Sequence, residues 1–206
     1  MADAARFTYV ALGDSTGMGA GAASGGGYVD RLYRRLLPLR PGARLINLCE
    51  NGATSAGVLD AQVPRAHRTA PSLITLGTGI NDVIWQVPDE AFAVDLEEIA
   101  VALAQLRAPV VLMNVPDLAL APIAARVDSA LYERRIEVLN EHVEATAARH
   151  HFRLVDLFTA TKRLRGRTGL FSPDGFHPSA EGYEEWAEQL WPAVHAALGE
   201  SAGARP

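Results

Sequence analysis

The sequence predicts an α/β protein built on a five-stranded parallel sheet with helices on both faces. Short apolar segments, rich in β-branched and aromatic residues, alternate along the chain with longer segments whose apolar residues recur at helical spacing. Several of the short segments end at glycine or proline, as strands do before a loop. Because helices separate successive strands, those strands are expected to run parallel and to be covered on both sides.

Five segments have the length and composition of buried strands, and the first of them reads FTYVAL. They are residues 7–12, 45–48, 73–76, 110–115 and 152–157. Gly13 ends the first strand, a loop at Asn51 and Gly52 follows the second, and residues 77–79 close the third. The fourth ends before Pro116, which cannot continue a ladder.

The segments between the strands are predicted to be helices or loops. Residues 16–27 are crowded with glycine and predict a loop. Helices are predicted over residues 28–37, 55–68, 89–107, 127–150 and 179–198, the last entered at Pro178. Residues 199–206 are expected to be a frayed tail. Without a repeat, linker or composition break, residues 1–206 are expected to form a single domain.

The composition indicates a globular protein, with 49% hydrophobic and 21% charged residues. The formal net charge of -5 favours neither nucleic acid nor an anionic membrane surface as a partner. A basic run over residues 162–167 is the local exception, and we expect it to be a solvated loop. The composition indicates no oligomeric state.

The single cysteine, Cys49, lies in an apolar stretch, where it is expected to be buried and to form no internal disulfide. The N-terminal residues lack a signal-peptide pattern. No apolar run approaches the ~20 residues of a membrane-spanning helix. We therefore expect a cytoplasmic protein without a membrane span.

Polar residues or glycines follow three of the predicted strands in pairs. Ligands of open parallel sheets bind at the carboxyl ends of the strands, where the loops gather. The three pairs are therefore expected to open on one rim of the sheet. They are Asp14 with Ser15, Asn51 with Gly52, and Asn81 with Asp82.

Ser15 is a candidate nucleophile because it follows a strand and a glycine, but a serine hydroxyl needs an adjacent base. That base is offered by His177, three residues after Asp174 and immediately before a helix. The Asp174 carboxylate could hold the far imidazole nitrogen and fix its tautomer. The alternatives are a turn serine, a capping aspartate and a surface histidine.

The reaction also needs hydrogen-bond donors for the developing oxyanion. Gly52 offers a backbone N–H that no side chain obstructs, Asn81 a side-chain amide, and Ser15 its own backbone N–H. A turn glycine and a turn-forming asparagine are the alternatives for Gly52 and Asn81.

Together these blocks resemble the SGNH (GDSL-like) hydrolase superfamily, in that family's order. The blocks are Gly13-Asp14-Ser15-x-x-x-Gly19, Gly52, Gly79-x-Asn81-Asp82 and Asp174-x-x-His177-Pro178. The match spans nearly the whole chain and is most similar to the lysophospholipase/arylesterase-like branch. Thr16 departs from the motif, where leucine is usual.

The resemblance implies a flavodoxin-like three-layer α/β/α sandwich. It implies Ser15 as nucleophile, His177 as general base and then acid, and Asp174 as the residue that orients His177. Ser15, Gly52 and Asn81 are implied as the oxyanion hole. Asp14 and Asp82 also match the motifs, and we interpret them as structural residues that hold the loops.

The implied activity is hydrolysis of a small-molecule carboxylic ester through an acyl-enzyme, which requires no metal and no organic cofactor. We expect small-to-medium acyl or aryl esters. A carbohydrate acetyl-esterase, a lysophospholipase and a thioesterase on the same fold are alternatives. Residues near the site that could line an apolar acyl pocket, or simply pack in the core, are Met18, Trp85, Leu170, Phe171 and Phe176.

Three other classes of protein share parts of this pattern. An α/β-hydrolase would explain Gly13-x-Ser15-x-Gly17, but only one strand precedes Ser15 and leaves no room for its upstream oxyanion loop. A metal-dependent phosphoesterase would use Asp14, Asn81, Asp82, Asp174 and His177, although the other histidines lack convincing ligand spacing. A non-catalytic binding module is disfavoured by the presence of both Ser15 and His177.

Overall fold

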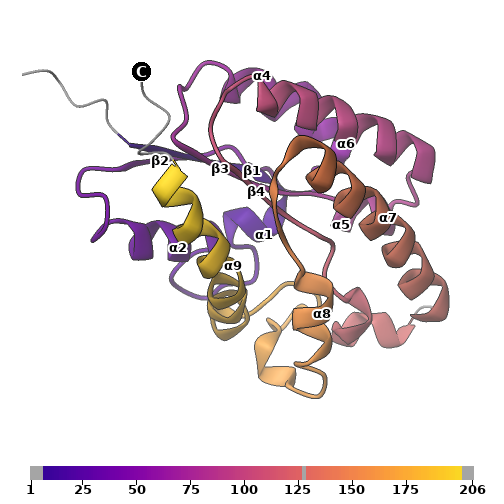
Figure 1. Cartoon of the computed structure of the whole chain (residues 1–206). Coiled ribbons are helices and arrows are strands. Elements are labelled where there is room, and N and C mark those ends of the chain that lie inside the picture. The colour runs from indigo at the N-terminus through magenta and orange to yellow at the C-terminus, as the bar shows by residue number, and fades with distance from the viewer. Residues whose placement is uncertain (1–6, 127–128, 201–206) are drawn as a thin grey trace, which may run out of the picture.

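A computed structural model of the protein describes residues 7–126 and 129–200, and a five-stranded sheet runs through its middle (Figure 1). The strands are β1 (Thr8–Gly13), β2 (Arg44–Asn47), β3 (Leu73–Gly77), β4 (Val110–Met113) and β5 (Arg153–Val155). Their spatial order is β2-β1-β3-β4-β5, and each neighbouring pair is parallel. This is the flavodoxin-like order. The predicted fold class is therefore confirmed.

Helices cover both faces of the sheet (Figure 1). On one face, α2 (Tyr28–Leu36) packs against α9 (Ala180–Glu200) and against the short α1 (Ser15–Met18). On the other face, α6 (Asp89–Ala104) packs against α7 (Ser129–His150). Beside α6 lies a continuous helical segment of α3 (Ser55–Gly57), the π-helical turn η1 (Val58–Gln62) and α4 (Val63–Ala66).

Shorter elements connect these layers. After β3 comes α5 (Ile80–Ile84), which contacts α7, and after β5 comes α8 (Leu157–Lys162), which contacts α9. Three 3₁₀ turns complete the described chain: η2 (Leu118–Leu120), η3 (Pro122–Arg126) and η4 (Thr168–Leu170).

The burial of each strand follows its place in the sheet. All residues of β3 and β4 are buried, as expected for central strands with helices on both sides. The edge strands β2 and β5 are more exposed. A buried polar pair between β1 and β3 is satisfied, because the Tyr9 hydroxyl lies 2.9 Å from the Thr75 hydroxyl.

The helices differ from the prediction mainly where they are short. Residues 16–18, predicted as part of the glycine-rich loop, belong to α1, which Asp14 caps by accepting a hydrogen bond from the Thr16 N–H. The predicted fifth strand is shortened in the same way, because Asp156 caps α8. Such one-turn helices show no periodicity in sequence.

The chain ends also differ. Residues 199 and 200 continue α9, so the prediction of a tail was wrong for them. The rest of that tail, 201–206, and residues 127–128 at the start of the predicted long helix lie outside the described residues.

The basic run is more ordered than a solvated loop. Lys162 ends α8 and lies 2.8 Å from Glu133, Arg165 lies 3.4 Å from Asp117, and Arg167 pairs with two glutamates of α9. Solvated surface was correctly predicted, but acidic neighbours neutralise these charges, and such neighbours cannot be read from a local sequence.

Two predictions about single features also have an outcome. Cys49 is buried and free, as predicted. Among residues 7–126 and 129–200, none of the helices combines the length and apolarity that crossing a membrane demands.

Candidate active site

The candidate residues meet at the carboxyl ends of β1 and β3, the two strands between which the chain changes direction along the sheet. Ser15 follows β1 directly, and Asn81 lies in α5, just after β3. Gly52 lies in the loop after β2. The loop between η4 and α9 brings Asp174 and His177 from the far end of the chain. All five residues line one cavity of about 660 Å³.

Ser15, His177 and Asp174 form a hydrogen-bonded chain. The Ser15 hydroxyl lies 3.1 Å from His177 Nε2, and His177 Nδ1 lies 2.7 Å from Asp174 Oδ2. The other oxygen, Asp174 Oδ1, accepts the N–H groups of Phe176 at 2.8 Å and His177 at 2.9 Å. This turn holds the carboxylate and the imidazole on one side of the loop.

The electrostatics of this chain favour an ionised Asp174. Partial burial acts to raise the pKa of Asp174, but hydrogen bonds from the His177 ring and the Phe176 N–H outweigh it and hold that pKa well below its usual range. A carboxylate at Nδ1 keeps the proton there and leaves the Nε2 lone pair facing Ser15. The arrangement can therefore remove the hydroxyl proton of Ser15.

The turn that carries Ser15 is fixed from several sides. Asp14 Oδ1 accepts the Thr16 N–H at 2.8 Å and the Thr16 hydroxyl at 2.7 Å. Burial raises the pKa of Asp14, and the two hydrogen bonds from Thr16 oppose that rise. Thr16, where the motif usually has leucine, therefore uses its hydroxyl to satisfy a buried carboxyl group.

Gln62 is a positioning residue that the sequence did not reveal. Its side-chain amide accepts the Gly13 N–H and donates to the Gly13 carbonyl, both at 2.8 Å, so it acts as a neighbouring strand would. Gln62 is completely buried in the π-helical turn η1. It thereby holds the end of β1 two residues before Ser15.

Three donors face the cavity near Ser15. Ser15 is the first residue of α1, so its N–H has no partner within that helix. Gly52 makes no hydrogen bond to any residue that the structure describes, and its φ of 75° is left-handed. A Cβ at Gly52 would meet nothing within 4 Å, so backbone conformation, not space, requires glycine there.

The third donor, the side chain of Asn81, is oriented by the loop that carries Gly52. Asn81 Nδ2 donates one hydrogen to the Ala53 carbonyl at 2.9 Å, and its second hydrogen remains for a ligand. Asp82, next in sequence, turns away from the cavity and accepts the Ser55 N–H at 3.0 Å and the Ser55 hydroxyl at 2.7 Å. Asp82 thus ties α5 to the start of α3.

The wall of the cavity is largely apolar. Of the five residues proposed to line an acyl pocket, Trp85 and Phe176 line this cavity. Leu170 and Phe171 line a smaller cavity of about 60 Å³ that shares His177 with it. Met18 lines neither and is half exposed, so its candidacy was wrong. Four further wall residues were not predicted. Leu118, Ile123 and Tyr132 come from elements distant along the chain, whereas Ile84 lies in α5 directly before Trp85.

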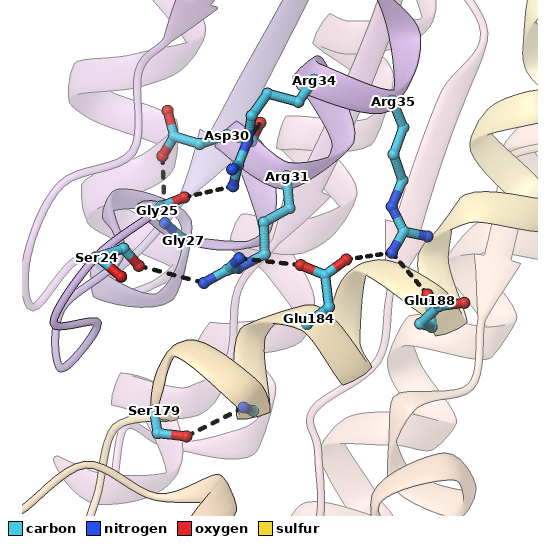
Figure 2. Close-up of polar contacts among 11 residues, drawn as sticks. Ser24, Gly25, Gly27, Asp30, Arg31, Arg34, Arg35, Ser179, Glu184 and Glu188 are labelled. Atoms are coloured by element: carbon cyan, nitrogen blue, oxygen red, sulfur yellow. Dashed lines mark hydrogen bonds and ion pairs between the residues drawn. The ribbon is translucent and has the colours of Figure 1, made fainter.

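The glycine-rich loop after α1 is anchored by arginines of α2 (Figure 2). Arg31, which is 8% exposed, donates to the Ser24 carbonyl at 3.3 Å and to Glu184 of α9 at 3.0 Å. Arg34 donates to the Gly25 carbonyl at 2.7 Å. These contacts fasten the loop to both helices of that face.

The same loop supports His177. The Tyr183 hydroxyl donates to the Ala20 carbonyl at 2.7 Å. At Gly21, where φ is +83°, an added Cβ would lie 2.6 Å from His177 Cβ and 2.8 Å from Ser172 Oγ. The backbone at Gly21 therefore lies against the residue that faces Ser15.

Titratable side chains elsewhere do not gather as metal ligands. Across the described ranges, no three histidine, cysteine, aspartate or glutamate side chains converge closely enough to share an ion. The carboxyl groups of Asp14 and Asp82 are instead engaged by Thr16 and Ser55.

Comparison with known proteins agrees with this geometry. Residues 11–185 match the model of the GDSL-like Lipase/Acylhydrolase family. Esterase TesA of Pseudomonas aeruginosa is 25% identical over 191 residues, which are 93% of this chain and 89% of that protein.

Solved structures share the fold as well. A crystal structure of TesA has a TM-score of 0.77 and 26% identity, covering 93% of this chain and 99% of that one. A lipase/acylhydrolase from Enterococcus faecalis, 21% identical, has a TM-score of 0.76 and covers 92% of this chain and 96% of its own. The chain is therefore a member of the GDSL-like lipase/acylhydrolase family, within the SGNH hydrolases, and an enzyme of that hydrolytic type.

Proposed function

We propose that the protein hydrolyses carboxylic esters through an acyl-enzyme on Ser15, with His177 as the base and Asp174 as the residue that orients it. The observation that supports this most directly is the hydrogen-bonded chain from Ser15 through His177 to Asp174 at the edge of a cavity. These three side chains supply the nucleophile, the base and the orienting carboxylate that such catalysis needs.

The proposed reaction has two halves. The Ser15 hydroxyl attacks the ester carbonyl while His177 Nε2 takes its proton, and the new oxyanion accepts hydrogen bonds from Ser15 N–H, Gly52 N–H and Asn81 Nδ2. The tetrahedral intermediate then expels the alcohol, which receives the proton from His177. Water repeats these steps on the acyl-enzyme, releases the carboxylic acid and restores Ser15.

The cavity wall supports a proposal for the substrate class. Ile84, Leu118, Ile123 and Phe176 present apolar surface beside Ser15, which favours an acyl or aryl group over a sugar. We therefore propose small-to-medium acyl or aryl esters as substrates.

The first test is hydrolysis of p-nitrophenyl acetate and butyrate by wild type and Ser15→Ala, each with and without EDTA. We expect Ser15→Ala to lower the rate by about three orders of magnitude or more, and EDTA to leave the wild-type rate unchanged. Ser72→Ala is the control, because Ser72 lies at the amino-terminal end of β3, whereas Ser15 lies at the carboxyl ends of the strands.

Two outcomes would count against the proposal. If Ser15→Ala keeps the wild-type rate, Ser15 is not the nucleophile. If activity disappears with EDTA, a metal takes part in the reaction. A series of acyl chain lengths tests the substrate class, and a maximum on long chains would overturn it.

A further inference from the structure

We propose that a second cavity beside the catalytic one binds an anionic group, a carboxylate or a phosphate, carried by the ester substrate; this rests on the esterase function proposed above. The second cavity has a volume of about 280 Å³ and lies between the end of α5, the start of α6 and α7. Its wall combines two arginines with apolar surface from two valines and a tyrosine ring, and the lining residues are Val83, Gln86, Asp89, Tyr132, Arg134, Arg135 and Val138.

The two cavities adjoin. Tyr132 lines both of them, so one aromatic side chain stands between the spaces. The end of α5 is shared in the same way, because Ile84 and Trp85 line the catalytic cavity while Val83 and Gln86 line the second. The part of an ester that extends past Tyr132 would therefore enter the second cavity.

One of the two arginines is committed to the protein. Arg135 donates to the Val87 carbonyl and lies 3.1 Å from the carboxylate of Asp89. Its guanidinium also lies 3.4 Å from the Asp82 carbonyl. Arg135 and Asp89 thus neutralise each other and hold the start of α6 against α7.

The other arginine is available to a ligand. Arg134 is exposed, and within the described part of the chain it makes no hydrogen bond or ion pair. With Arg135 and Asp89 paired, Arg134 leaves the cavity with one net positive charge. The whole chain has a net charge of -5, so this positive cavity differs in sign from the molecule around it.

The chemistry of that wall indicates an anion. A guanidinium offers a planar fork of donors that matches carboxylate and phosphate oxygens. The Tyr132 hydroxyl and the Gln86 amide, on the same wall, can donate further hydrogen bonds. A neutral ester would gain none of these charge-assisted contacts.

The test uses esters matched in size but not in charge. The carboxylate pair is p-nitrophenyl hexanoate and the p-nitrophenyl monoester of adipic acid, whose charge is on the acyl side. The phosphate pair is monohexanoyl glycerol and monohexanoyl glycerol phosphate, whose charge is on the alcohol side. In Arg134→Ala we expect KM to rise about fivefold for at least one anionic ester and to stay unchanged for its neutral match.

The matched control is Arg68→Ala, since Arg68 is an exposed arginine that precedes β3, near the amino-terminal end of that strand. It should change KM for none of the four esters. Which pair responds to Arg134→Ala identifies the anion and the side of the ester that carries it. The proposal is wrong if no anionic ester responds, or if each neutral ester responds equally.

Binding separates this proposal from the esterase function. Titration of Ser15→Ala with hexyl phosphate and with adipate monoamide (6-amino-6-oxohexanoate) measures binding to the cavity without turnover. We expect Arg134→Ala, added to Ser15→Ala, to weaken the binding of at least one of them about fivefold, and high salt to do the same. Unchanged binding of both would overturn the proposal even if the esters are hydrolysed, and weakened binding would support it even if they are not.

Discussion

Among single residues, Asp174 sets the tautomer of His177, the proposed base. Its Oδ2 accepts a hydrogen bond from the His177 ring, and its Oδ1 accepts two backbone N–H groups. Both Asp174 oxygens act as acceptors in these hydrogen bonds, and an ionised carboxylate is the form that offers acceptors only. An asparagine at this position would offer a donor where the imidazole N–H now points. We therefore expect Asp174→Asn to lower kcat by about three to four orders of magnitude.

The same contacts link Asp174 to stability. Its pKa is lowered in the folded protein, so the ionised carboxylate stabilises the fold above the unfolded-state pKa of about 3.9. This contribution is lost as the pH falls through the lower folded-state pKa. We expect Asp174→Asn to reduce the free energy of unfolding at pH 7, and the difference from wild type to shrink below about pH 4. Urea titrations at pH 7, 5 and 3 measure it, and a difference that stays constant across them would contradict the assignment.

Among elements, the glycine-rich loop is the support of the His177 loop. Gly21 lies against His177, while Arg31 and Arg34 fasten the loop to α2 (Figure 2). The loop thus transmits the packing of α2 and α9 to the residue that faces Ser15. This explains why glycine is needed at Gly21 for close approach as well as for its left-handed φ of 83°.

This support predicts a specific effect of Gly21→Ala. The new methyl group would push His177 away from Ser15, so we expect kcat to fall at least tenfold, and KM to change little. Gly42→Ala is the matched control, because Gly42 has a φ of 79° and a Cβ there would meet nothing within 4 Å. Both variants strain the backbone alike, so equal kcat values in the two would show that the contact with His177 is unimportant.

For the whole molecule, the packing predicts one cooperative unit. Buried residues of β1, β3, β4 and β5 share one core with α2, α6, α7 and α9, and the partly buried Leu45 and Ile46 of β2 pack against it. Since Trp186 lies in α9 and is part of that core, its fluorescence reports on the same packing as the sheet. We expect far-UV circular dichroism and tryptophan fluorescence to give coincident urea transitions. Two separate transitions would contradict the single-domain organisation, which stays a prediction here, as does the cytoplasmic location.

Much of the fold could be predicted because it depends on local patterns of apolar and polar residues. Apolar runs such as residues 73–76 need burial on both faces, and a parallel sheet between helix layers provides it where such runs alternate with helical segments. The candidate residues Ser15 and Asn81 were found for a related reason. They follow strands directly, and the carboxyl ends of parallel strands open on one rim whatever the order of the strands.

The other features of the fold and the site depend on contacts between segments that are distant along the chain. The spatial order of the strands, the bond between Gln62 and Gly13, and the support of His177 by Gly21 each join residues far apart in sequence. The same holds for the two cavities, whose shared wall at Tyr132 comes from α7. A local pattern records which faces of an element must be buried, but not which neighbour buries them. Local patterns in the sequence therefore predict the layers and the candidate reacting residues, whereas packing between distant segments sets the shape and charge of the space around them.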